Sequence, residues 1–149
     1  MKKAVFVAAA LFLAAAGASA AGIESVAYNE LVMSISRAKP PVVSGRFVVF
    51  TAPGDSRHAG ISFEHENYGK IHSLKRLTRL DEAGKPRLDE TSKRVDSVLF
   101  FIAEVPPSVD KLRYRMVIDG LWTVDPLNDS IEYDYANGIR VSTVAVERY

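Results

Sequence analysis

Apolar residues are distributed in three different ways along this chain. A continuous apolar run extends from Ala4 to Ala16. Residues 21–39 instead carry apolar side chains at steps of three and four, the spacing of a one-sided helix. From Val42 to Tyr149 the apolar residues come in short runs rich in β-branched and aromatic side chains, separated by turn residues, as in strands. The pattern therefore predicts three segments, each with its own kind of structure.

The first segment has the layout of a secretory signal peptide. Two lysines precede the apolar run, and the small residues Gly17 to Ala20 follow it. The run is shorter than the roughly 20 residues that a membrane-spanning helix needs, so we favour a cleaved signal over a retained anchor. We expect cleavage after Ala20, or after Ala18, which removes residues 1–20. The mature chain is then periplasmic or secreted, with no stable membrane insertion.

The second segment, residues 21–41, is expected to form an N-terminal helix and a linker. Ile23, Leu31 and Ile35 share one face of this helix. Pro40–Pro41 ends it, because proline disfavours the helical conformation at the residue before it. The apolar face either packs on the domain that follows or meets a protein partner.

Residues 42–149 are expected to form one all-β domain. A polar stretch over 81–94 is expected to be a long exposed connection, and no strand–helix alternation occurs that would favour a doubly wound α/β sheet. The strand runs are 42–43 together with 47–50, then 59–63, 71–80, 95–105, 112–119, 121–124 and 139–146. About seven short strands with turn residues between them are typical of an antiparallel, immunoglobulin-like β-sandwich.

Composition narrows the chemistry that this domain can perform. The chain has 149 residues, a formal net charge of +1 and no cysteine. The length suits one domain, and the balanced charge argues against a nucleic-acid partner. The absence of cysteine excludes thiolate zinc sites, iron–sulfur clusters, cysteine nucleophiles and disulfides.

Other residues that carry chemistry form no recognisable catalytic or metal-binding pattern. His58, His65 and His72 lack the spacing of a zinc site. Asp119 and Asp125 are better explained as turn residues than as a catalytic pair of carboxylates, and the chain has no Gly-x-Ser-x-Gly elbow. We therefore expect no enzyme activity, no metal and no cofactor.

Asp119–Gly120 predicts a tight hairpin, because a two-residue turn of the favoured hand needs positive φ at both positions. The register pairs Ile118 with Leu121 and Val117 with Trp122, and paired residues share a face. One face, expected in the core, carries Leu112, Tyr114, Met116, Ile118 and Leu121. The opposite face carries Arg113, Arg115, Val117, Trp122 and Val124.

The only tryptophan is therefore expected to point outward beside Arg115. Its flat face can stack on a sugar ring, while the arginine donates to the hydroxyls of that ring. Two alternatives remain: Trp122 packs under the N-terminal helix, or Arg115 simply covers it by a cation–π contact. Tyr133 and Tyr135 either extend a sugar-facing rim or anchor a loop by burying their rings.

The stretch Tyr114–Pro126 (Tyr-Arg-Met-Val-Ile-Asp-Gly-Leu-Trp-Thr-Val-Asp-Pro) resembles the hallmark of family-48 carbohydrate-binding modules. These modules include the glycogen-binding domain of AMP-activated protein kinase β subunits, and the early-set domains of branching and debranching enzymes are similar. The resemblance extends loosely through Asn137–Gly138 to the last strand and more weakly back to Val48.

The resemblance implies an early-set β-sandwich over residues 42–149 that binds α-glucans such as glycogen or starch. Trp122 stands at the family's stacking tryptophan and Arg115 at its basic, hydrogen-bonding position. In place of a second tryptophan in an earlier loop this chain offers Tyr68. Asn137 is the nearest candidate for an asparagine that the family places just before the last strand.

Two functions are therefore compared. The first is an exported, non-catalytic α-glucan-binding module that uses Trp122, Arg115, Tyr68 and Asn137. The alternative is a sugar-blind structural or protein-interaction module of the same fold, which meets a partner through the N-terminal helix or an uncovered sheet edge.

Overall fold

The computed structural model describes residues 26–77, 82–85, 87–88, 90–92 and 98–146. The chain divides into two compact units, residues 1–35 and residues 36–149. The predicted signal peptide and residues 21–25 of the predicted helix lie outside the described residues. No helix in the described part of the chain is long and apolar enough to cross a membrane.

In the first unit a helix covers residues 26–34, so it ends five residues before the expected end at Lys39. Two hydrogen bonds mark its C-terminus. The Ile35 amide donates to the Val32 carbonyl (3.2 Å), and the Ser34 hydroxyl donates to the Leu31 carbonyl (2.6 Å). Bonds of this short span tighten the last turn and satisfy carbonyls that an ending helix leaves open. The helix therefore ends before Pro40–Pro41, and these prolines are not what terminates it.

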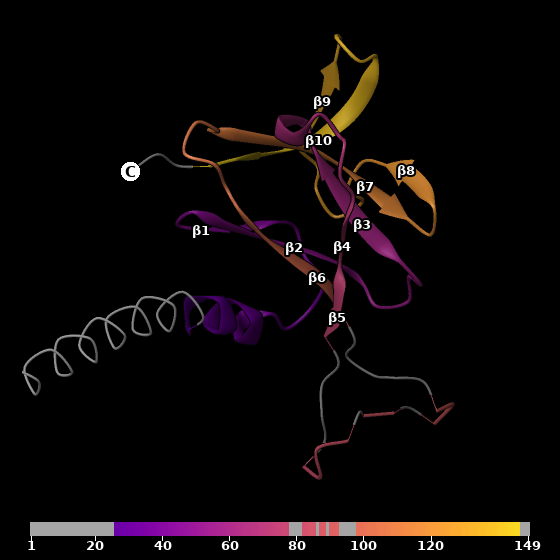
Figure 1. The fold of residues 1–149 in the computed structure, drawn as a ribbon. Helices are drawn as coiled ribbons and strands as arrows, with labels where there is room; N and C mark the ends of the chain where they lie inside the picture. The colour runs from indigo at the N-terminus through magenta and orange to yellow at the C-terminus, as the bar shows by residue number, and fades with distance from the viewer. Residues whose placement is uncertain (1–25, 78–81, 86, 89, 93–97, 147–149) are drawn as a thin grey trace, which may run out of the picture. The chain divides into compact units, whose positions relative to one another are not determined.

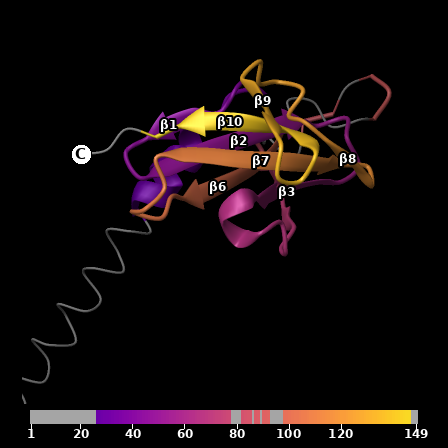
Figure 2. The ribbon, with the colours of Figure 1, turned by 90° about the horizontal axis from the view of Figure 1, so that it is seen from above.

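The second unit is the predicted all-β sandwich, built from two antiparallel sheets (Figure 1 and Figure 2). The smaller sheet has the order β1-β2-β6-β5, and its strands are β1 (Val42–Ser44), β2 (Phe47–Pro53), β6 (Val98–Glu104) and β5 (Lys75–Leu77). The larger sheet has the order β4-β3-β7-β10-β9, with β8 paired to β7. Its strands are β3 (Ala59–Phe63), β4 (His72–Ser73), β7 (Lys111–Ile118), β8 (Leu121–Thr123), β9 (Ile131–Asp134) and β10 (Ile139–Ala145).

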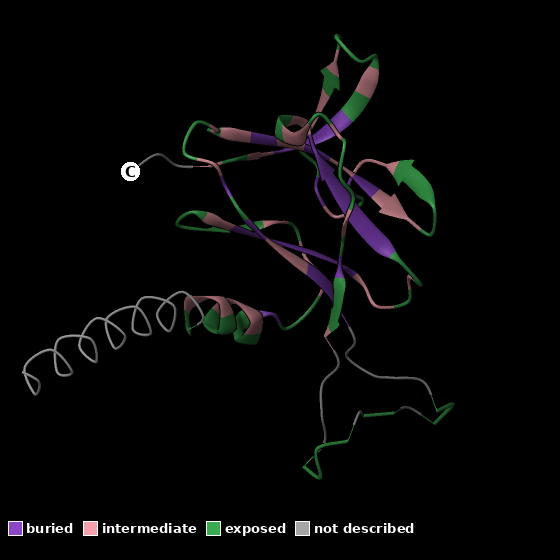
Figure 3. Ribbon diagram, viewed as in Figure 1, coloured by how far each residue is buried: buried purple, intermediate pink, exposed green. Residues whose placement is uncertain are grey.

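Alternating side chains of β2 and β6 from one sheet and of β3 and β7 from the other form the core of this unit, where Figure 3 shows the buried segments. Phe50 and Tyr114 are both fully buried, and their rings pack edge to face with centroids 4.8 Å apart. Leu112 and Met116 follow Tyr114 on the same face of β7, as the alternation predicts. Their burial fixes which face of β7 points away from the core.

Two strand predictions are corrected. The expected strand over 71–80 is divided between the two sheets: β4 pairs with β3, β5 pairs with β6, and residues 78–80 lie outside the described residues. The chain changes sheet at Leu74, whose side chain is buried and whose amide donates to the Ala59 carbonyl (2.9 Å). In addition, β9 was not predicted as a strand. The described residues of the 81–94 connection are all exposed, as expected.

The hairpin between β7 and β8 has the predicted register, with Ile118 opposite Leu121 and Val117 opposite Trp122. Asp119 and Gly120 have φ values of 49° and 84°, and the Asp119 carboxylate accepts bonds from the Arg57 and His58 amides. The core assignment of Leu121 is wrong, since this side chain is 73% exposed. Leu121 is next to the turn, on β8, which pairs only with β7 among the described strands. The apolar face of the hairpin therefore extends past the edge of the core.

Candidate functional site

Trp122 lies on the outer face of the larger sheet. Its side chain is 44% exposed, and the Arg115 guanidinium carbon lies 5.8 Å from the centre of the indole. The cation–π contact foreseen as one alternative is present, yet it leaves almost half of the tryptophan in solvent. A flat apolar surface with a cation at its border is therefore available to a ligand.

Arg115 is held in the middle of the sheet. It stands on β7 opposite Ser62 of β3, while β8 and β10 pair with the other edge of β7. Its Nε atom is buried and has no hydrogen-bond partner among the described residues. A buried donor without a partner costs about 1–3 kcal/mol, so this position lowers the stability of the fold.

Tyr68 is brought to this face by a tight loop after the 3₁₀ helix η1 (Glu64–Glu66). Asn67 and Tyr68 both have φ of 54°, a left-handed conformation that non-glycine residues seldom adopt. The Tyr68 amide donates to the Phe63 carbonyl (3.0 Å), and the Ser62 hydroxyl donates to the Lys70 carbonyl (2.8 Å). These bonds at both ends hold the loop against β3.

The Tyr68 hydroxyl is buried, and like Arg115 Nε it has no hydrogen-bond partner among the described residues. The pKa of Tyr68 is raised to about 12, mainly by burial and also by the carboxylates of Glu64 and Asp134, while the Arg115 and Arg113 charges oppose the shift. These charges act on the phenol because they lie near it. The structure thus brings Tyr68 into the neighbourhood of Arg115.

Asn137 lies in the turn between β9 and β10, and its side chain serves that turn. Its amide nitrogen donates to Asp134 Oδ2 (2.7 Å), and the backbone amides of Ala136 and Asn137 donate to Asp134 Oδ1. These bonds lower the pKa of Asp134. Asn137 is therefore linked to Tyr68 only indirectly, by its bond to Asp134, whose charge acts on the Tyr68 phenol. The structure does not bring the Asn137 amide together with Trp122 and Arg115.

Four charged side chains on this face were not singled out as site residues: Glu64, Lys111, Arg113 and Glu132. We call them the charge ladder. Glu132 accepts bonds from Lys111 Nζ (2.6 Å) and Arg113 Nε (3.2 Å), and Glu64 lies 3.6 Å from Arg113. These contacts raise the pKa of Arg113 and lower that of Glu132. The ladder was missed because it needs β9, although the alternation of Glu132 and Asp134 with two tyrosines could have indicated that strand.

Tyr133 lies on the other face of β9, because it alternates with Glu132 and Asp134, and Tyr135 lies in the turn that follows this strand. Their rings contact each other edge to face, with an interplanar angle of 73° and centroids 4.8 Å apart, and Tyr135 is 88% exposed. The alternative in which both rings are buried to anchor a loop is wrong, since Tyr133 is 51% exposed and Tyr135 is exposed still further.

A second polar cluster lies on the inner face of β7. The buried Tyr114 hydroxyl donates to Asp125 Oδ2 (2.7 Å) and accepts a bond from Asn128 Nδ2 (3.0 Å). Asp125 Oδ1 accepts from the Leu127 amide (2.9 Å), which agrees with its predicted role in a turn, and the Asp125 amide donates to the Ser142 hydroxyl (2.7 Å). We call these residues the Tyr114 network.

His72 takes part in contacts with neighbouring side chains. His72 bonds to Glu66 (2.7 Å) and stacks on Phe101, with ring centroids 5.0 Å apart. Among the described residues, no group of three or more His, Cys, Asp or Glu side chains is arranged to hold a metal ion.

Comparison with protein-family models finds no match for this chain, and comparison with curated protein sequences finds none either. The resemblance to family-48 modules therefore rests on Tyr114–Pro126, and the geometry of the outer face carries the functional argument.

Proposed function

We propose that the mature chain is an exported, non-catalytic module that binds α-glucan chains, such as glycogen or starch, across the outer face of β7 and β8. The observation that carries this proposal is the half-exposed indole of Trp122 with the Arg115 guanidinium at its border. The indole stacks on the C–H face of a glucose ring. The export itself rests on the N-terminal sequence.

Two polar side chains of the outer face, one of them beside the indole, favour a hydroxyl-rich ligand. Arg115 Nε and the Tyr68 hydroxyl are buried without partners among the described residues, and sugar hydroxyls both donate and accept hydrogen bonds. The Arg115 guanidinium at the border of the indole can donate to such hydroxyls. Arg115 then orients the glucan and Tyr68 supplies a second aromatic surface.

The electrostatics of this face favour binding over hydrolysis. A glycosidase needs one carboxylic acid with a raised pKa to protonate the leaving group. Here the pKa values of Glu132 and Asp134 are lowered by the hydrogen bonds that they accept. These carboxylates are therefore charged acceptors that organise the face, and an uncharged glucan suits a surface on which acidic and basic side chains alternate.

The test is affinity electrophoresis of the mature protein through gels with and without glycogen. We expect glycogen to retard the wild type and not Trp122→Ala. Leu121→Ala is the matched control, because Leu121 is exposed on the other face of the same hairpin, and it should migrate like the wild type. Equal mobility of all three proteins in both gels would refute glucan binding.

A sugar-blind interaction module remains the second candidate, and one observation favours it. Val42 and Val43 are exposed on β1, which is an edge strand of the smaller sheet. An uncovered edge can add a strand from another protein. In that case Trp122→Ala leaves complex formation with the partner unchanged, whereas Val43→Lys weakens it in the same pull-down.

A further inference from the structure

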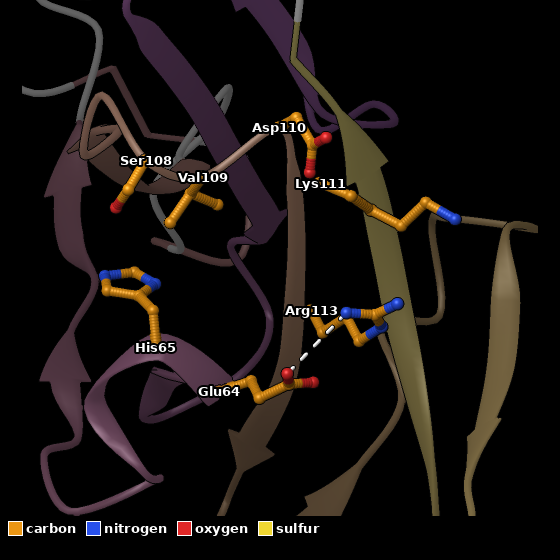
Figure 4. Close-up of a pocket in the computed structure, with 7 residues that line it drawn as sticks. All are labelled: Glu64, His65, Ser108, Val109, Asp110, Lys111 and Arg113. Carbon is orange, nitrogen blue, oxygen red and sulfur yellow. Dashed lines mark ion pairs between the residues drawn. The ribbon is translucent and has the colours of Figure 1, made fainter.

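A small hollow lies at one end of the candidate glucan face, between η1 and the loop that precedes β7 (Figure 4). Its volume is about 200 Å³, below the range of pockets for drug-sized ligands but large enough for one small ring. The residues that line it are Glu64, His65, Ser108, Val109, Asp110, Lys111 and Arg113. The hollow therefore suits one unit of a larger ligand.

The lining carries both signs of charge and little apolar surface. Val109 is its one aliphatic side chain, and acidic Glu64 and Asp110 stand against basic Lys111 and Arg113. A bound anion would meet the two carboxylates, and a bound cation would meet the Arg113 guanidinium. A neutral ligand with several hydroxyls can donate to the carboxylates and accept from Arg113, whereas Lys111 Nζ is bonded to Glu132 and points away from the hollow (Figure 4).

One ion pair in the lining of the hollow leaves room for a ligand group between its two members. Glu64 Oε1 and the Arg113 guanidinium are 3.6 Å apart, the contact that is dashed in Figure 4. This separation is longer than a hydrogen bond, so the two groups attract without being locked together. A ligand hydroxyl placed beside them donates to Glu64 and accepts from Arg113, which gives two charge-assisted hydrogen bonds.

The hollow shares its elements with the proposed glucan face. Arg113 stands two residues before Arg115 on the same face of β7, and η1 leads directly into the loop that carries Tyr68. Along β7, Arg113 lies four residues from Val117, the partner of Trp122, a span of about 13 Å. A chain that stacks on Trp122 and follows β7 toward its N-terminal end therefore arrives at the hollow.

We propose that this hollow is an end subsite, which receives the terminal sugar residue of a glucan lying across Trp122; the inference rests on the proposed glucan binding. The stacking surface accepts any stretch of chain because it is open. The hollow takes an end, because its volume of about 200 Å³ has room for a single unit. The module therefore binds chain termini more tightly than chain interiors.

The test compares two ligands by calorimetry on the mature protein. Maltoheptaose is linear and has ends, whereas β-cyclodextrin closes the same number of glucose units into a ring without ends. Ser108→Phe fills the hollow from an exposed loop position. Ser44→Phe places the same bulk on the exposed strand β1 and is the matched control.

We expect Ser108→Phe to weaken maltoheptaose binding by about tenfold, the loss of roughly one charge-assisted hydrogen bond, and to leave β-cyclodextrin binding unchanged. Glu64→Gln, which keeps the size of the side chain, should weaken the linear ligand selectively in the same way. Ser44→Phe should alter neither affinity.

Two results would overturn the end subsite while leaving the proposed function intact. One is unchanged maltoheptaose binding in both hollow variants; the other is an equal loss for the linear and the cyclic ligand. If the wild type binds neither ligand and is not retarded by glycogen, the proposed function and the end subsite fall together.

Discussion

The two faces of β7 carry polar clusters that differ in how completely they are bonded. On the inner face the Tyr114 hydroxyl is fully buried, donates to Asp125 and accepts from Asn128. On the outer face the Tyr68 hydroxyl and Arg115 Nε are buried without partners among the described residues. Tyr114 and Arg115 are neighbours in sequence, so one strand supports both arrangements.

The difference separates stability from binding. A complete buried network rigidifies the fold because removal of any member leaves another unsatisfied. An incomplete network costs stability, whereas the exposed aromatic ring of the same face offers its surface to a ligand. We therefore expect substitutions on the inner face to change the free energy of unfolding, and substitutions on the outer face to change affinity.

The largest effect is expected for Asp125→Ala. The substitution leaves the Tyr114 hydroxyl and the Leu127 amide without their acceptor in a buried site, at about 1–3 kcal/mol each. The free energy of unfolding, measured with urea, should fall by about 3 kcal/mol or more. A change below about 0.5 kcal/mol, typical of surface positions, would contradict a structural role for the Tyr114 network.

Trp122→Ala is expected to do the opposite. Since the indole is half exposed, the free energy of unfolding should change by less than about 1 kcal/mol, while affinity for glycogen falls at least about tenfold, as for truncated aromatic anchors. Urea denaturation and affinity electrophoresis on the same preparation measure both quantities. A large loss of stability with unchanged retardation would reverse the assignment of the two faces.

The matched pair Tyr114→Phe and Tyr68→Phe sharpens the contrast, because each removes one hydroxyl. Tyr114→Phe deprives Asp125 and Asn128 of a partner and should lower the free energy of unfolding by about 1–3 kcal/mol. Tyr68→Phe removes a hydroxyl that has no partner among the described residues, so stability should stay constant or rise by up to about 1 kcal/mol. Equal destabilisation in thermal or urea unfolding would show that both hydroxyls are bonded alike.

The smallest effect concerns pH. Burial raises the pKa of Asp125, while the bonds from Tyr114 and Leu127 oppose the shift and keep it modest. A carboxyl whose folded pKa is raised contributes stability below its unfolded pKa of about 4, and this contribution is lost as the pH rises through the folded pKa. Between pH 4 and 7 the wild type should therefore lose stability relative to Asp125→Asn. A difference in unfolding free energy that is constant with pH, or opposite in sign, would contradict this.

Most strands could be predicted because they depend on local rules. The Asp119–Gly120 turn and the alternation along residues 112–118 place Trp122 and Arg115 on the outer face without reference to any other segment. The same reasoning failed for Leu121, since alternation assigns a side chain to a face but does not say where the covering sheet stops. The division of residues 71–80 at Leu74 was missed for a similar reason. The pairing strand changes from β3 to β6 at this point, while the pattern of apolar and polar residues does not change.

The candidate site was predictable in part. Tyr68 was proposed from a resemblance, whereas its place near Arg115 depends on a loop with two left-handed residues and on bonds to Phe63 and Lys70. Asn137 was also proposed, yet its amide is used by Asp134 within a turn. The charge ladder joins side chains of η1, β7 and β9, so no local stretch of sequence indicates it.

By itself the sequence determined the all-β class, the β7–β8 hairpin and the outward direction of its indole, since backbone turn preference and the two-residue period of a strand act between neighbours. Only the tertiary structure decided which polar atoms are satisfied. Tyr114 finds Asp125 and Asn128, while Tyr68 and Arg115 Nε find no partner in the described part of the chain. Hydrogen-bond completion depends on segments that are distant along the chain and meet only when the sheets assemble.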